Sequence, residues 1–201
     1  METNKKYLLP DWPIWILLAL ELAGSLYLYP HLHAYAFLSF FITLGLYLLM
    51  FLALPAIDPH RDNYNRFLDT FRFMRFVIIL SLVALHWLLI LAYVHGWHVS
   101  IEQALITTLS ILWVACGNVM GRVKQMTWYF AVRNRWTLSD ERVFVRAQRF
   151  AGRALVIAGL VGIVVGFIGG TTGWILFVAE AVVVTILSHV YSYFDYRKTH
   201  N

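Results

Sequence analysis

The sequence predicts an all-α membrane protein, a polytopic bundle of six transmembrane helices arranged as three hairpins. Of its 201 residues, 60% are hydrophobic and only 13% are charged, and the mean hydropathy is +0.66. These values lie outside the profile of a soluble domain of this size. Six apolar runs approach the ~20 residues that cross ~30 Å of hydrocarbon. Every Lys and Arg falls on the same side of the bilayer in this arrangement.

The predicted spans follow one another within a single transmembrane domain. They cover about residues 12–29, 34–54, 73–93, 104–119, 154–170 and 174–193. The turn Tyr29-Pro30-His31 separates the first two spans. Pro55 and Pro59 end the second, because proline lacks a backbone donor and disfavours helix in the residue before it. Two polar connectors remain, at about 55–72 and 120–153.

The basic residues orient this bundle. The positive residues are Lys5, Lys6, Arg61, Arg66, Arg72, Arg75, eight residues from Arg122 to Arg153, Arg197 and Lys198. The positive-inside rule therefore places both termini and both connectors in the cytoplasm. The net charge of +5 fits this orientation and an anionic lipid surface, so it does not indicate direct binding of nucleic acid. The single cysteine, Cys116, excludes an intrachain disulfide.

The central connector carries half of all Lys and Arg and is the leading candidate for function. Thr137 and Asp140 fit a capping box, and Ser139 is a second candidate N-cap, so we expect a short interfacial helix to begin near Ser139. Four arginines then follow at spacings of four, three and four, and form one stripe: Arg142, Arg146, Arg149 and Arg153. Anionic headgroups are the favoured partner of this stripe, and a cytoplasmic protein is the alternative.

The fifth span carries glycines at a spacing of seven. These are Gly152, Gly159, Gly166 and Gly173, with Gly162 and Gly169 between them. Small residues on one helical face allow two backbones to approach closely in lipid. We expect the partner to be another helix of the same chain rather than a second copy, and the oligomeric state stays open.

Several segments together carry a family pattern. They are Pro55-Ala56-Ile57-Asp58-Pro59, Asn63-Tyr64, Gly117-Asn118, Arg133-Asn134-Arg135-Trp136-Thr137-Leu138, Val143-Phe144, Arg149-Phe150-Ala151-Gly152, Tyr191-Ser192-Tyr193 and Arg197-Lys198. Over roughly residues 46–198 the chain resembles the SdpI family, the sporulation-delay-protein immunity proteins. It departs from that pattern at Ala131, Asn134 and Arg135, which replace Gly, Thr and Pro, and at Ala147-Gln148, which replace Thr-His.

The resemblance implies a bacterial cytoplasmic-membrane protein that protects its cell from a small hydrophobic peptide toxin. In the signalling branch of the family it also implies recruitment of a transcriptional repressor to the membrane. The candidate binding residues are Asp58, Pro59, Asn63, Tyr64, Gly117, Asn118, Arg133, Trp136, Thr137, Leu138, Arg142, Arg146, Arg149 and Gly152. We expect neither a cofactor nor an enzymatic activity.

Two other function classes remain as alternatives. A small proton- or ion-linked transporter would use ionisable residues inside the predicted spans, namely Glu21, His86, Glu180 and His189. Against it, Glu180 and His189 point to opposite faces of their helix, and no broken-helix repeat is visible. A lipid-modifying enzyme is the second alternative, although the connectors offer neither a Cys/His pair nor a metal-binding spacing.

Two further hypotheses concern the loops. In the first, Asp58 and Asp62 form an ionic latch with the central connector, with Arg133 or Arg135 as the leading partner. In the second, four histidines at the other membrane face bind a transition metal: His31, His33, His95 and His98, with Glu102 nearby. Because HxH and HxxH are weak metal-binding spacings, four unrelated interfacial histidines are the favoured interpretation.

Overall fold

The computed structural model describes residues 11–96, 100–127 and 131–200, without the side chains of residues 51 and 52. All regular structure in these ranges is helical, which confirms the predicted all-α class. Six helices dominate the fold: α1 Trp12–Leu32, α2 Leu38–Leu48, α4 Leu68–His95, α5 Ile101–Met120, α6 Glu141–Ile168 and α7 Gly170–His200. Shorter helical pieces join them: a 3-10 turn His33–Phe37, a π-helical turn Leu49–Ala53, α3 Leu54–Ile57 and a 3-10 stretch Arg61–Phe67.

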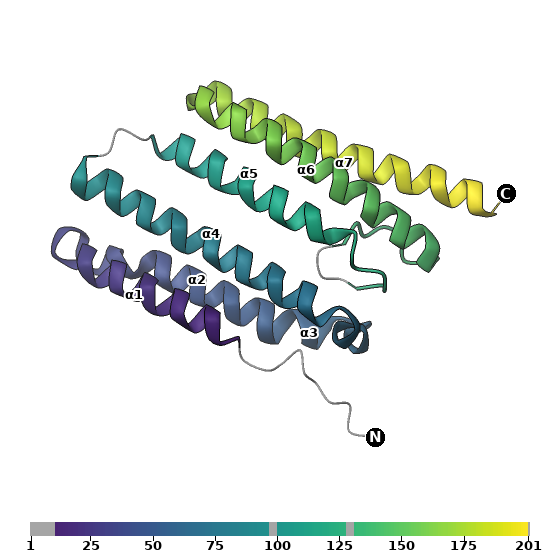
Figure 1. Ribbon diagram of the computed structural model, residues 1–201, viewed down its shortest axis with the longest axis horizontal. Coiled ribbons are helices and arrows are strands. Elements are labelled where there is room, and N and C mark those ends of the chain that lie inside the picture. Colours follow the sequence, from purple (N-terminus) through teal and green to yellow (C-terminus); the bar gives the residue numbers. More distant parts are fainter. Residues whose placement is uncertain (1–10, 97–99, 128–130, 201) are drawn as a thin grey trace, which may run out of the picture.

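Five stretches in the described ranges are long and apolar enough to cross a membrane. They are Trp12–Leu48, Arg61–His95, Ile101–Met120, Glu141–Ile168 and Gly170–His200. The first stretch contains both α1 and α2, which the turn at His33–Phe37 folds into a hairpin (Figure 1). Inside this hairpin the Trp15 and Tyr47 rings lie 5.8 Å apart. The chain is therefore a polytopic membrane protein built from helical hairpins.

The helices lie side by side as a row of hairpins (Figure 1). Helix α4 packs against α1 and α2, α5 connects α4 to α6, and α7 covers α6. The tightest pairing is between α5 and α6. The C-terminal half thus forms a three-helix unit that α5 joins to the N-terminal half.

Glycines allow the close approach of α5 and α6. A Cβ atom at Gly152 would lie 2.7 Å from the Gly117 carbonyl oxygen, and one at Gly117 would lie 2.6 Å from the Gly152 carbonyl oxygen. Two turns further on, a Cβ at Gly159 would lie 2.6 Å from the Ser110 carbonyl oxygen. These distances leave no room for a side chain. The expected intramolecular packing surface is confirmed, and its partner is α5.

The central connector differs from the prediction of a separate interfacial helix. Its helical part is the beginning of α6, which runs without interruption from Glu141 to Ile168. No proline interrupts this stretch, and Gly152, which could weaken it, is packed against α5. At 1.5 Å per residue these 28 residues span about 42 Å, more than the ~30 Å hydrocarbon core. The arginine stripe therefore lies on the part of a spanning helix that projects toward water.

One end of the bundle gathers the positive charge, and we call it the basic end. It is formed by α3, the start of α4, the end of α5, the start of α6 and the end of α7, which lie together on the right of Figure 1. A hydrophobic core joins all of these elements except α7, with Tyr64, Phe71 and Met74 packed against Val119 and Phe144. The two connectors are therefore anchored on the same hydrophobic core.

Candidate functional site

The first connector turns around the side chain of Asp58, which is 2% exposed. Its carboxylate accepts hydrogen bonds from the Tyr64 hydroxyl at 2.8 Å, the His60 backbone N–H at 2.7 Å and the Thr127 hydroxyl at 3.0 Å. Pro59 follows directly, where its fixed φ helps to hold the turn. The Asn63 amide also donates to the Met126 carbonyl at 2.9 Å. Asp58 and Asn63 thus tie the first connector to residues 126 and 127 of the second.

The two connectors are in contact, as the predicted latch requires. The described link from Asp58 to the second connector is a hydrogen bond that the Thr127 hydroxyl donates, and an ion pair with Arg133 or Arg135 stays a prediction. Asp62 is exposed to solvent. Several hydrogen-bond donors together stabilise the buried carboxylate of Asp58.

A compact turn built on Asn134 forms the middle of the second connector. The Asn134 side-chain oxygen accepts from the backbone N–H groups of Trp136, at 3.1 Å, and Thr137, at 2.9 Å. This is the local pattern by which asparagine stabilises turns. The Leu138 N–H closes the turn on the Asn134 carbonyl at 3.1 Å. On its other side, the Asn134 amide donates to the Ser192 hydroxyl of α7 at 2.7 Å.

Thr137 has a different role from the predicted capping box. It is fully buried, and its hydroxyl donates to the Val132 carbonyl at 2.7 Å and accepts from the Asn134 N–H at 3.1 Å. The N-cap of α6 is Asp140, one residue after the second candidate Ser139, and its carboxylate accepts from the Arg142 N–H at 2.8 Å. Thr137 therefore closes the turn before the helix, and Asp140 is the N-cap residue.

The turn rests on α6 and α7. The buried Gln148 side chain accepts from the Val132 N–H at 3.2 Å. The Trp136 ring meets Tyr193 with 5.1 Å between centroids, and the Phe150 and Tyr191 rings stack at 4.3 Å. Aromatic pairs at these separations add stability beyond their buried area.

Sequence reasoning did not select Thr127, Gln148, Ser192 or Asp195 as site residues. For Gln148 a signal existed, because it is a polar residue between Phe144 and Ala151 on the apolar face of α6. For α7 the signal was the spacing of Ser192, Asp195 and Thr199, which places three polar side chains on one helical face.

The structure divides the arginine stripe into paired and unpaired members. Arg142 lies 3.5 Å from its own N-cap, Asp140. Arg146 donates through Nε to both carboxylate oxygens of Asp195, at 2.9 and 2.8 Å, and reaches Thr199 at 2.7 Å. In the described part of the chain, Arg149 and Arg153 have neither a hydrogen-bond nor an ion-pair partner. Among the described contacts of the stripe, these two guanidiniums therefore keep their full hydrogen-bonding capacity for a ligand.

Asp140 is the titratable group of the connector whose pKa shifts clearly. Desolvation acts to raise the pKa of its carboxyl, but the hydrogen bonds from Arg142 outweigh it, so that the pKa lies below its ordinary value. Asp140 therefore stays ionised at neutral pH, as an N-cap beside the positive end of a helix requires.

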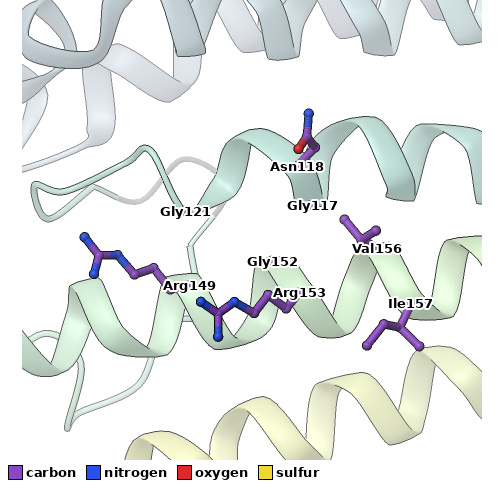
Figure 2. Close-up of a pocket in the computed structure, with 8 residues that line it drawn as sticks. All are labelled: Gly117, Asn118, Gly121, Arg149, Gly152, Arg153, Val156 and Ile157. Carbon is purple, nitrogen blue, oxygen red and sulfur yellow. The ribbon is translucent and has the colours of Figure 1, made fainter.

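Beside the unpaired arginines lies a pocket of about 600 Å³ at the crossing of α5 and α6 (Figure 2). It is lined by Gly117, Asn118, Gly121, Arg149, Gly152, Arg153, Val156 and Ile157. Gly117 and Gly152 let the two helices meet closely at this pocket, because a Cβ at either position would overlap the backbone of the facing helix. Four of the predicted site residues meet at this pocket, together with Arg153 of the arginine stripe: Gly117, Asn118, Arg149 and Gly152.

The intramembrane polar residues fall into separate groups. The Glu21 carboxylate, fully buried between helices, accepts from the Thr43 hydroxyl at 2.9 Å. His86, which is 5% exposed, shares a 2.6 Å hydrogen bond with Ser39. On α7, Glu180 lies near Gly162 of α6, whereas His189 is exposed and bonds to the carbonyl one turn before it, at 2.9 Å. These residues do not form one continuous chain of polar groups among the described contacts.

The proposed metal ligands do not gather in the described ranges, where no group of three or more His, Cys, Asp or Glu side chains could hold an ion. His33 and His95 instead contact the rings of Tyr29 and Tyr27, at 6.0 and 6.3 Å. His31 lies in the last turn of α1. His98 lies outside the described residues.

Comparison with known proteins identifies relatives of this chain. Residues 124–192, which include most of the second connector with α6 and much of α7, match the SdpI/YfhL protein family. The chain is 26% identical over 161 residues to the immunity protein SdpI of Bacillus subtilis (strain 168), an alignment that covers 80% of this chain and 76% of that protein. No solved structure matches the chain.

Proposed function

We propose that this chain, a member of the SdpI/YfhL family and a distant homologue of the Bacillus subtilis immunity protein SdpI, is itself an immunity-type membrane protein. It protects its cell against a small hydrophobic peptide toxin and does so without catalysis. The protein lies in the bacterial cytoplasmic membrane. The connectors at the basic end supply a rigid element on which this protection depends.

The proposed topology has six spans, with α1 and α2 crossing separately. Both termini and the basic end face the cytoplasm, because membrane insertion keeps Lys and Arg on that side. The opposite end of the bundle, with the turn His33–Phe37, faces outward. A toxin that has entered the lipid would then meet the exposed apolar faces of the helices.

One observation carries the proposal: the segments that resemble the family converge on the same end of the bundle. Asp58 and Asn63 bind residues 127 and 126, and the turn at Asn134 binds Ser192 on α7. The polar atoms of this assembly are largely satisfied within the chain, which suits a fixed platform better than a reactive site. Each of these side chains therefore fixes the position of the segment to which it is hydrogen-bonded.

The test uses Trp136→Ala, which removes the ring that contacts Tyr193. Trp136 lies outside the hydrophobic spans, so insertion into the membrane should not change. We expect a toxin-sensitive bacterium that expresses the variant to lose protection, at equal membrane abundance, relative to wild type. Arg135→Ala is the matched control from the same turn, because its side chain is exposed. Equal protection by wild type and Trp136→Ala would count against the platform.

A cytoplasmic repressor is a second proposed partner. It would meet the exposed cations of the second connector, which include Arg133, Arg135 and Arg142. Exposed charges of one sign mainly steer the encounter of two proteins and fix their orientation. Co-purification of the repressor with membranes should then weaken when these arginines are replaced, while protection persists.

Proton- or ion-linked transport is the second candidate function, and one observation favours it. Glu21 is fully buried, and its second carboxylate oxygen has no hydrogen-bond partner among the described residues. Buried intramembrane acids often mark ion pathways. If this function holds, the protein in liposomes will dissipate or build an ion gradient, and Glu21→Gln or Glu180→Gln will abolish the flux. Absence of flux from the wild-type protein would remove this candidate.

A further inference from the structure

The two unpaired arginines lie on one side of α6, one turn apart. Arg149 and Arg153 are exposed, and neither finds an acidic partner in the described ranges, whereas Arg146 on the same stripe is neutralised by Asp195. Figure 2 shows both side chains extending toward the N-terminal end of α6, so that their guanidiniums lie on the same side of the α5–α6 crossing. The pair concentrates positive charge at one edge of the pocket.

The position of this pair along α6 coincides with the level of the lipid headgroups. Helix α6 ends at Ile168, near the end of the bundle opposite to the basic end. About 20 residues are needed to cross the hydrocarbon, which puts its other edge close to Arg149. Helix α5, with 20 residues, reaches the same edge near Asn118. The pocket therefore opens where the phosphate groups of the inner leaflet lie.

An apolar groove continues from the pocket toward the membrane centre. It lies between α6 and α7 with a volume of about 880 Å³, and Arg153 and Ile157 line both the groove and the pocket. Deeper in the groove the lining is aliphatic, with Val161 and Val165 on α6 and Leu176 on α7. Glu180 also lines it, beside Gly162. The arginines thus lie at the headgroup level and the apolar groove lies deeper in the membrane. An anionic lipid places its phosphate and its acyl chain in the same order.

We propose that Arg149 and Arg153 bind the phosphodiester of an anionic glycerophospholipid, whose acyl chain lies in the α6–α7 groove. Each planar guanidinium presents paired N–H donors that match two phosphate oxygens. Asn118 lines the rim of the same pocket from α5. Gly117 and Gly152 bring α5 and α6 close together at this pocket, so a headgroup bound there lies beside both helices. The bound lipid fills the pocket beside the α5–α6 crossing. This crossing positions the second connector.

Native mass spectrometry of the detergent-solubilised full-length protein tests this site without any toxin. The protein is offered equal amounts of phosphatidylglycerol and phosphatidylcholine, and the lipid that remains bound is counted. We expect wild type to retain phosphatidylglycerol, and the double variant Arg149→Ala/Arg153→Ala to retain about 25-fold less, because each basic residue near an anionic headgroup raises the affinity about fivefold. The charge-matched control Arg135→Ala/Lys198→Ala, which changes two exposed cations outside the pocket, should behave as wild type.

Two further arms identify the ligand. Val161→Trp fills the groove without a change of charge, so it should also reduce lipid retention if an acyl chain lies there. Inorganic phosphate in excess should not displace the lipid. The proposal is overturned if the double variant retains as much phosphatidylglycerol as wild type, if phosphatidylcholine is retained equally, or if inorganic phosphate displaces the lipid and so shows a site for the free ion.

Discussion

Substitution of Gly159 by alanine tests the close crossing of α5 and α6 most sharply. The added Cβ would lie 2.6 Å from the Ser110 carbonyl oxygen and 2.9 Å from the Val114 backbone nitrogen. Both atoms belong to the backbone of α5, so a side-chain rotation cannot relieve the overlap. Helix α5 would have to retreat by about 1 Å, since nonbonded carbons settle at ~3.5 Å or more.

The expected cost of this retreat is about 1–3 kcal/mol, the range for overpacking in a well-packed interior. Gly45→Ala is the matched control, because a Cβ at Gly45 meets nothing within 4 Å. Alanine in a helix is favoured over glycine by about 0.5–1 kcal/mol, so the control should be neutral or slightly stabilising. The free energy of unfolding is measured by denaturant titration in detergent micelles. Equal stability of the two alanine variants would refute the close crossing.

Three smaller changes test the contacts at the basic end. Asp58→Ala should lower the free energy of unfolding by about 1–3 kcal/mol, because buried donors lose their acceptor; denaturant titration measures this, and no loss would contradict the contacts. Asp195→Asn should cost at most about 1 kcal/mol, since its partner Arg146 is partly exposed, and a double-mutant cycle should show that the two side chains are coupled. The depressed pKa of Asp140 means that its stabilisation of α6 is present above the unfolded pKa and is lost as pH falls through the lower folded pKa. The protection factor of the amides in the first turn of α6, which compares their exchange with the intrinsic rate at the same pH, should therefore fall in acid for wild type. This acid-dependent fall should disappear in Asp140→Asn.

Hydropathy was sufficient to predict an all-α protein of long apolar helices, because it acts over whole segments and tolerates errors of a few residues. The start of α6 was harder to predict. Its arginine-rich first turns are polar, so hydropathy alone places the start of the span at residue 154, although the helix begins at Glu141 and is unbroken. What keeps those turns helical is tertiary contact with α5 at Gly152 and with α7 at Asp195.

The partners within the site were less predictable than its position. Opposite charges suggested that Asp58 would bind an arginine, but a carboxylate accepts equally well from hydroxyl groups, and Tyr64 and Thr127 were not distinguishable in the sequence as donors. At Asn134 the chain departs from the family pattern, and the structure shows the asparagine itself making the turn. Such side-chain geometry depends on distances between segments that a single sequence does not contain.

Survival of a toxin-sensitive bacterium that expresses wild type, Asn134→Ala or Glu21→Gln tests the central claim most directly. Membrane abundance is measured in parallel, and cells with an empty vector set the baseline. Asn134→Ala removes the side chain that joins the turn to Ser192, whereas Glu21→Gln removes only a buried charge in the N-terminal half. The account predicts that wild type and Glu21→Gln protect equally and that Asn134→Ala does not. Protection by Asn134→Ala at the wild-type level, together with its loss in Glu21→Gln, would contradict it.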